Sequence, residues 1–141
     1  MTAFGDVLLR LSVVIQRRYT QICAEHDLTP TQALLLCQVK EKPSRMAELA
    51  TSLGMSKNAL SQLVDRTEQR GLVHRHPSEQ DRRVITLDVT PTGRRMADAL
   101  YADVTTRIQD IAAPLSPKDQ FLLELLTTKI IGNTRPDLHP Q

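Results

Sequence analysis

Two amphipathic helical patterns joined by a short turn occupy the middle of the chain, at residues 46–53 and 57–70. Gly54 lies between them and can adopt the left-handed conformation that ends a helix, and Ser56 stands where an N-cap residue belongs. At about 3.6 residues per turn, the second pattern gathers its apolar side chains on one face and short polar ones on the other. Gly71 follows as a helix-ending residue. This arrangement predicts a helix-turn-helix, whose second helix reads DNA.

The polar face of the second helix carries amide, hydroxyl and carboxylate groups, whereas an ordinary solvated helix face is rich in Glu, Lys and Arg. Such groups form hydrogen bonds with base edges in the DNA major groove. The helix residues that we expect at DNA are Ser56, Lys57, Asn58, Ser61, Gln62, Asp65 and Arg66. A pair of short helices in any small bundle would show the same apolar pattern, so the interpretation depends on the sequence that follows.

Two segments directly downstream have the character of β-strands. Residues 72–76 alternate between apolar and polar side chains, and residues 84–89 are rich in β-branched ones. A hairpin directly after a recognition helix is the wing of a winged helix. Its polar loop ends in arginines, which favour the narrow minor groove of A·T-rich DNA. The wing residues that we expect at DNA are Asp81, Arg82 and Arg83.

Apolar patterns on both sides of this module predict four further helices. One covers residues 4–25, and one begins at Pro30 and is apolar nearly all round, so that we expect it in the core. A long helix from Pro91 carries apolar residues as far as Ile111, and the last covers residues 117–131. Three of these helices are preceded by a capping residue next to a proline. These capping residues are Thr29, Thr90 and Ser116.

The predicted fold is mainly α with a small β-hairpin wing (α+β), in one compact domain. We divide the chain into an N-terminal dimerisation helix (1–28), a winged helix-turn-helix module (29–90), C-terminal dimerisation helices (91–132) and a disordered tail (133–141). The terminal helices have more apolar surface than one winged helix can cover. This excess indicates that the chain pairs with a second copy of itself.

Composition limits the classes of function. A length of 141 residues allows one domain, and a net charge of +2 excludes a polycationic nucleic-acid coat, so DNA affinity has to come from where the charges lie. We see no signal peptide and no apolar run of membrane-spanning length, and two cysteines without metal spacing fit a reducing compartment. We therefore expect a cytoplasmic protein without a membrane partner. No glycine-rich phosphate loop, nucleophile elbow or HExxH spacing is found, and we expect neither an enzyme nor a cofactor.

Several of these motifs together resemble the MarR (multiple antibiotic resistance regulator) family. They are MAELA at 46–50, SK at 56–57, LVDR at 63–66, GLV at 71–73, DRR at 81–83 and TPTG at 90–93. The resemblance covers residues 28–100 by motif and the flanking helices by pattern only. It implies a homodimeric, ligand-responsive regulator, most often a repressor, that binds a pseudo-palindromic operator. It also implies that Asp81 braces Arg83 while Arg82 lies nearer phosphate.

One residue departs from the family pattern, and one property of the family guides a search for a ligand. Gln62 stands where an arginine is frequent, and because Arg reads guanine while Gln prefers adenine, a familiar operator sequence cannot be transferred. Many relatives bind phenolic carboxylates between the dimer helices and the winged helix, which implies a small anionic aromatic effector. The candidate effector-binding residues are Arg10, Arg17, Arg18 and Tyr19. Alternatively, these arginines coat the solvent face of the dimer.

Two other interpretations involve cysteine or histidine. A redox-sensing regulator would act through Cys23, but the thiol lies near a helix C-terminus, where the helix dipole opposes a thiolate, so a small buried apolar role fits better. A zinc site would enlist Cys23, Glu25, His26 and Glu41, yet the helix from Pro91 offers no histidine. His74 and His76 share one strand face without an obvious third ligand, and we expect no metal there.

A different class of function would be a winged-helix protein-interaction module without DNA binding. A module of that kind has no need for two arginines at the end of its hairpin, and the Asp81-Arg82-Arg83 sequence therefore favours DNA.

Overall fold

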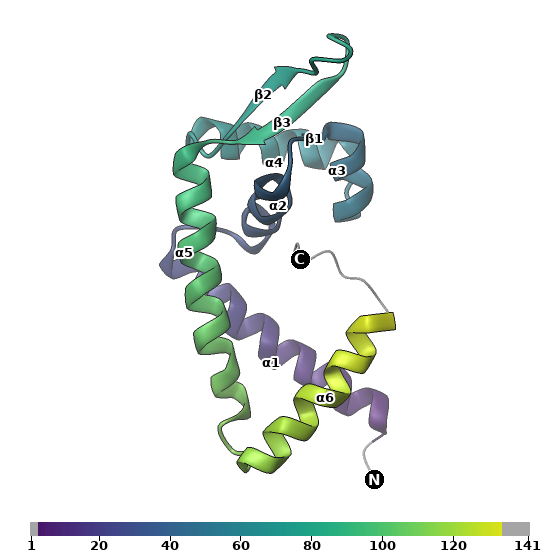
Figure 1. The fold of residues 1–141 in the computed structure, drawn as a ribbon, viewed down its shortest axis with the longest axis vertical. Helices are drawn as coiled ribbons and strands as arrows, with labels where there is room; N and C mark the ends of the chain where they lie inside the picture. Colours follow the sequence, from purple (N-terminus) through teal and green to yellow (C-terminus); the bar gives the residue numbers. More distant parts are fainter. Residues whose placement is uncertain (1–2, 134–141) are drawn as a thin grey trace.

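The computed structural model describes residues 3–133 and places the winged module at one end of a set of long helices (Figure 1). The elements are α1 (Phe4–Glu25), α2 (Pro30–Glu41), β1 (Ser44–Arg45), α3 (Met46–Leu53), α4 (Lys57–Gln69), β2 (Val73–Pro77), β3 (Ile85–Val89), α5 (Pro91–Arg107), the 3₁₀-helix η1 (Ile108–Ala112) and α6 (Pro117–Asn133). The predicted fold class, mainly α with a β wing, is confirmed.

Capping residues set the helix starts as the sequence predicts. The hydroxyls of Thr29, Ser56, Thr90 and Ser116 each accept a hydrogen bond of 3.0–3.2 Å from the backbone N–H three residues on. Gly54 and Gly71 both have positive φ, at 64° and 74°, and end α3 and α4 in the left-handed conformation. The turn between the two helices of the helix-turn-helix is therefore fixed by local chemistry.

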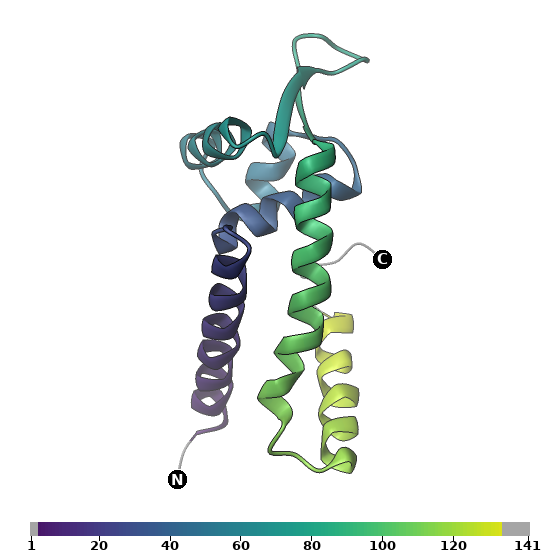
Figure 2. The same ribbon diagram turned by 90° about the vertical axis from the view of Figure 1, so that its left-hand side faces the viewer.

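The sheet has three antiparallel strands in the order β1-β3-β2, one more than predicted. The additional strand β1 pairs Ser44 with Leu87 and Arg45 with Thr86. Two residues are too few to show a period-2 pattern, which explains why the sequence did not reveal the strand. The β2–β3 hairpin extends beyond the helices as the wing (Figures 1 and 2).

One apolar core lies between the sheet, α2, α3, α4 and the first turns of α5. Ala33, Leu35, Leu36 and Val39 of α2 are buried, which confirms the core position expected for this helix. Of α1, only Ile22 and Cys23 are buried, so the core holds the end of that helix and not its beginning.

The helix that begins at Pro91 is shorter as an α-helix than predicted. It ends at Arg107, and the chain continues to Ala112 as a 3₁₀-helix. Pro114 has no N–H to donate to the carbonyl of Asp110, which instead accepts a hydrogen bond of 3.1 Å from the N–H of Ala113. Tightening of a last turn in this way is common at helix ends.

The expected excess of apolar surface is present on the terminal helices. Within residues 3–133, every large exposed apolar side chain except Ile85 and Tyr101 lies on α1 or α6. Figure 2 shows α6 beside the far part of α5 and α1 on the other side of the molecule. All residues from 117 to 132 are exposed in the single chain.

Three expectations concern the domain division, the C-terminal tail and membrane-spanning segments. The domain division at 28/29 and 90/91 stays a prediction. Asn133, assigned to the tail, is the last residue of α6, and the rest of the predicted tail lies outside the described residues. Among the helices of residues 3–133, none is both long and apolar enough to cross a membrane.

Candidate nucleic-acid interface

Helix α4 presents most of the predicted DNA-contacting residues to solvent. Its apolar side, with Leu60, Leu63 and Val64, is buried against the core, and this burial fixes the rotation of the helix. On the opposite side, Ser61 is half-buried, and the other predicted residues are exposed. The exposed residues are Ser56, Lys57, Asn58, Gln62, Asp65 and Arg66.

Asp65 is exposed but is already engaged within the chain. Its carboxylate accepts a hydrogen bond of 2.7 Å from the guanidinium of Arg75 on β2. The same guanidinium donates to Oε1 of Glu68 at 2.8 Å and to the backbone carbonyl of Ser61 at 3.4 Å. Oε2 of Glu68 in turn accepts the backbone N–H of Arg75 at 2.9 Å. Arg75 therefore ties the recognition helix to the first strand of the wing.

Sequence reasoning did not identify Arg75. The residue lies between two histidines in a short strand, and its partners precede it by 7 to 14 residues in a different element. The available signal was the alternation of the strand: Arg75 is on the same side as the buried Val73 and has to face α4. A charged residue in such a position needs partners, and Asp65 and Glu68 are one turn apart on the facing helix.

The tip of the wing carries the predicted arginine–aspartate brace. Asp81 accepts hydrogen bonds from the backbone N–H of Arg83 at 3.0 Å and from its Nε at 3.2 Å, with a longer contact from Nη2 at 3.4 Å. Hydrogen bonds from Arg83 hold the pKa of Asp81 below its usual value. The Arg83 side chain is 91% exposed, so it is oriented but still available to DNA. Arg82 is exposed as well and has no ion pair among residues 3–133.

The candidate effector residues on α1 differ in their surroundings. Arg10 is exposed and forms an ion pair of 2.9 Å with Asp6, one turn away. Arg17 is exposed and Arg18 half-buried, and within the described chain neither forms a hydrogen bond or ion pair. Tyr19 packs against the core, and burial raises the pKa of its hydroxyl.

Cys23 has the surroundings of a buried apolar residue. It is fully buried, and this burial raises the pKa of its thiol, although a hydrogen bond from Tyr19 partly opposes the effect. A raised pKa lowers the thiolate fraction on which peroxide sensing depends. The geometry of the single chain therefore favours the structural interpretation of Cys23 over the redox-sensing one.

Two residues of the zinc site considered from the sequence, Glu25 and His26, belong to an ion-pair cluster that links the end of α1 to α5. Arg107 binds both oxygens of Glu25 and also contacts Asp103 at 3.2 Å. Asp103 is also 2.9 Å from Nε2 of His26. Hydrogen bonds from His26 and Arg107 lower the pKa of Asp103, and one from Arg107 lowers the pKa of Glu25. Glu25 and His26 therefore link the two helices and are not free to bind a metal.

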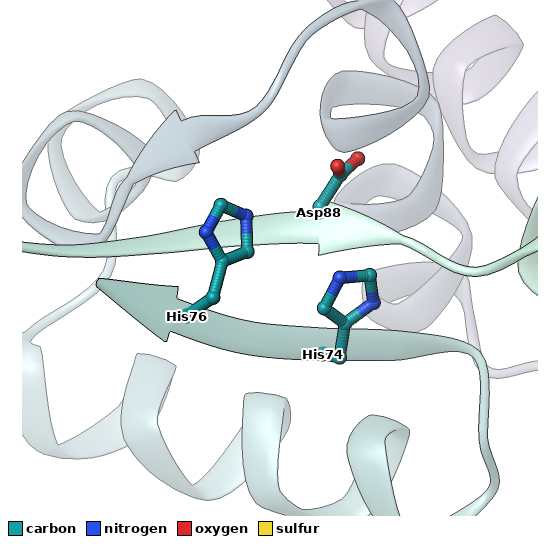
Figure 3. Close-up of side chains that lie close together, drawn as sticks. All are labelled: His74, His76 and Asp88. Carbon is teal, nitrogen blue, oxygen red and sulfur yellow. The ribbon is translucent and has the colours of Figure 1, made fainter. Parts of the chain in front are cut away.

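The expectation that no third ligand lies near His74 and His76 is wrong. Both histidines share one face of β2 as predicted, and Asp88 of β3 lies beside them (Figure 3). The antiparallel register pairs His74 directly with Asp88, two residues that are 14 positions apart in the chain.

Comparisons with known proteins agree with this architecture. A sequence model of the MarR family matches residues 26–84, which hold most of the winged module. The transcriptional regulator PecS of Dickeya dadantii is 23% identical over 87% of this chain and 76% of its own length. The transcriptional regulator MhqR of Bacillus subtilis is 24% identical over 93% of this chain and 95% of its own length.

Solved structures show the same fold. Wild-type MarR from E. coli in its apo form has a TM-score of 0.82 and 22% identity, covering 93% of this chain and 98% of that one. The transcriptional repressor CouR, solved bound to a 23-mer DNA duplex, has a TM-score of 0.75 and 28% identity over 91% of this chain and 92% of that one. The relatives are transcription regulators and not enzymes. Over residues 26–84 the chain thus matches the MarR family of transcriptional regulators, and its overall fold is the winged-helix fold of solved MarR structures.

Proposed function

We propose that this protein is a ligand-responsive repressor that binds a pseudo-palindromic operator as a homodimer. The observation that carries the proposal is the combination of two elements in one winged module: a recognition helix with free amide groups and a projecting wing with a braced arginine. Similarity to CouR, a repressor solved with DNA, supports the same conclusion. Because its target would be operator DNA, we place the protein in the cytoplasm.

The apolar faces of α1 and α6 support the dimer. Phe121 is 69% exposed and Phe4 is 77% exposed in the single chain, and monomeric proteins rarely leave extended apolar surfaces of this kind in water. A two-fold dimer would bury both helices and carry two α4 helices. Their half-sites should then be separated by about 34–36 Å, one turn of DNA.

The dimer can be tested by placing a charge on the apolar surface. We expect the unmodified protein to sediment as a dimer at micromolar concentration and Leu126→Glu, on the exposed side of α6, to shift it towards monomer. Lys118→Glu, also on α6 but at a polar position, serves as the control. A stable monomer of the unmodified protein would contradict the proposal.

Sequence-specific binding can be tested with duplexes selected from a random pool. In fluorescence anisotropy, Gln62→Ala should relax the preference at one or two base pairs by about 1–3 kcal/mol. Gln109→Ala, an exposed glutamine on η1, should leave both affinity and selection profile unchanged. Equal affinity of the unmodified protein for selected and random duplexes would refute specific recognition.

The two wing arginines should have different effects on binding. Arg83→Ala should reduce affinity together with the preference for A·T tracts, because the braced guanidinium is oriented for a narrow minor groove. Arg82→Ala should weaken binding to all sequences alike and reduce the slope of log affinity against log salt by about one phosphate contact. If both variants bind as the unmodified protein does, the wing does not contact DNA.

The ligand response is proposed to involve a small anionic aromatic molecule beside α1. Arg17 and Arg18 supply two cationic groups without partners in the described chain, and the half-buried Tyr19, which packs against the core, supplies a hydroxyl. Arg10 is a weaker candidate because Asp6 already neutralises it. An effector changes DNA affinity only if it prefers a dimer conformation different from the operator-bound one.

A thermal-shift screen of hydroxybenzoates, followed by titration of the protein–operator complex, tests the response. We expect a ligand that stabilises the protein and weakens DNA binding, with both effects lost in Arg17→Ala or Arg18→Ala. Gln16→Ala, at an exposed position of the same helix, should retain both effects and is the matched control. A ligand that acts equally on all three variants would remove the assignment to α1.

A further inference from the structure

We propose that His74, His76 and Asp88 form a binding site for a divalent transition-metal ion on the outer face of the wing sheet. The three side chains come from two adjacent strands and lie together on one face (Figure 3). One potential ligand atom from each residue lies within 4.8 Å of those of the other two. The site is distinct from the residues of α4 and the wing tip that are expected at DNA.

The strand register creates the cluster. His74 is directly opposite Asp88 in the antiparallel pair, and His76 lies two residues further along β2, so that its side chain points to the same face. The two imidazole rings have centroids 5.5 Å apart. These positions depend on backbone pairing and do not require long, flexible side chains to find one another.

The spacing requires only a small adjustment to hold an ion. Zinc bonds to nitrogen and oxygen of about 2.0–2.2 Å in a tetrahedral site place the ligand atoms roughly 3.3 Å from each other. Atoms at most 4.8 Å apart therefore have to approach by about 1.5 Å or less, which side-chain rotation can provide. His74 is exposed and the other two residues are half-buried, so the rotation is not blocked by core packing.

Two of the three groups are already oriented by backbone atoms. Nδ1 of His76 lies 3.1 Å from the carbonyl oxygen of Pro77, so a proton on Nδ1 leaves Nε2 free for a metal. Oδ1 of Asp88 accepts the N–H of Val89 at 2.8 Å, which leaves Oδ2 available. Metal-binding histidines usually donate their second ring N–H to a carbonyl or carboxylate in this way.

The donor set points to the class of ion. Two imidazoles and one carboxylate suit Zn²⁺, Co²⁺, Ni²⁺ or Cu²⁺, whereas Ca²⁺ and Mg²⁺ prefer oxygen ligands throughout. Three protein ligands leave at least one coordination position for water or for a group from another molecule. Arg75, between the two histidines, points to the opposite side of the sheet and binds α4, so an ion would not occupy the DNA-reading face.

A bound ion would link β2 to β3 where the wing leaves the body of the protein. Because the strands have to be paired for the three ligands to meet, binding is coupled to the folded hairpin. We therefore expect saturating Zn²⁺ to raise the melting temperature of the protein and to slow hydrogen exchange in β2 and β3.

The test uses the purified 141-residue protein after treatment with a chelator. Isothermal titration with Zn²⁺ should give one ion per chain, and Co²⁺ should give visible d–d absorption without the near-ultraviolet band of a thiolate ligand. His74→Ala and Asp88→Asn should each weaken binding more than about tenfold, since even partners of metal ligands commonly matter by that factor. His139→Ala, at a histidine outside the described residues, is the control and should bind normally.

Two further variants and measurements separate ligation from other roles. Asp88→His replaces one ligand type by another and should retain binding, whereas a purely electrostatic role of the carboxylate would be lost. Melting curves without metal should be the same for all variants, which shows that the hairpin is still formed. Absence of heat and of Co²⁺ absorption, binding that is unaffected by His74→Ala and Asp88→Asn, or a thiolate band would each overturn the proposal.

Discussion

Replacement of Arg75 tests how the recognition helix is held against the wing. Arg75→Met retains most of the apolar stem of the side chain and removes the guanidinium that binds Asp65, Glu68 and the carbonyl of Ser61. The bond from Glu68 to the backbone N–H of residue 75 can persist in the variant. The substitution therefore removes the side-chain links between α4 and β2 and leaves the strand itself in place.

The expected loss follows from the exposure of the three charged groups. The Arg75 side chain is 26% exposed, against 37% for Glu68 and 55% for Asp65. A solvent-exposed ion pair contributes about 0.2–1 kcal/mol, and a better shielded hydrogen bond to a charged group about 1.5–3 kcal/mol. We expect the Arg75–Asp65 pair to contribute an amount near the range of exposed ion pairs, and the Arg75–Glu68 pair an amount between the two ranges. We expect Arg75→Met to lower the free energy of unfolding by about 1–2 kcal/mol.

Urea unfolding at fixed protein concentration measures this loss, because the stability of the proposed dimer would depend on concentration. Arg66→Met, at an exposed arginine of α4, should change the free energy of unfolding by less than about 0.5 kcal/mol. A double-mutant cycle with Asp65→Asn isolates the pair and should give a coupling energy of about 0.5 kcal/mol. A coupling energy of zero, with a base-specific change in the selected DNA for Asp65→Asn alone, would show that Asp65 reads DNA and would refute the reasoning.

Two further predictions concern stability. Gly93→Ala should lower the free energy of unfolding, measured by urea unfolding, by about 1–3 kcal/mol, because its added Cβ would lie 2.0 Å from the carbonyl oxygen of Leu72. Thr92→Ala, at the neighbouring exposed position, should change the free energy of unfolding by less than about 0.5 kcal/mol. The lowered pKa values of Asp103 and Glu25 mean that their contribution is complete above the unfolded-state pKa and is lost as pH falls through the folded-state pKa. Melting temperatures should therefore drop below about pH 4, and Asp103→Asn should show a smaller drop; an equal drop in both proteins would remove the cluster as the cause.

The elements that the sequence predicted correctly depend on signals within a few residues. Ser56 and Thr90 cap helices by accepting a backbone N–H three residues on, and Gly54 supplies a conformation that other residues rarely adopt. The brace between Asp81 and Arg83 is also local and was expected from the family resemblance. Each of these side-chain contacts joins residues no more than three positions apart.

The features that the sequence did not reveal depend on pairing between distant segments. Strand β1 exists only because Ser44 and Arg45 meet β3, more than 40 residues later. Asp88 joins the two histidines only through the hairpin register. The predicted strand ends do not give that register, since His76 opposite Val84 would place His74 opposite Thr86, whereas the observed pairing of Pro77 with Ile85 places His74 opposite Asp88. The proximity of Asp88 to the two histidines therefore became visible only when the structure gave the strand register.

The intramolecular bond of Asp65 changes where sequence discrimination on α4 should reside. Asp65 is exposed, as are Asn58 and Gln62, but its carboxylate accepts a hydrogen bond from Arg75. Within residues 3–133, the side chains of Asn58 and Gln62 form no hydrogen bond. In helix-turn-helix proteins the N-terminal residues of the recognition helix contact base edges. The amides of Asn58 and Gln62 lie in the N-terminal half of α4, and the Asp65 carboxylate lies in the C-terminal half. Substitutions at 58 and 62 should therefore change which sequences are selected, and those at 65 should change how firmly the helix is held while it reads them.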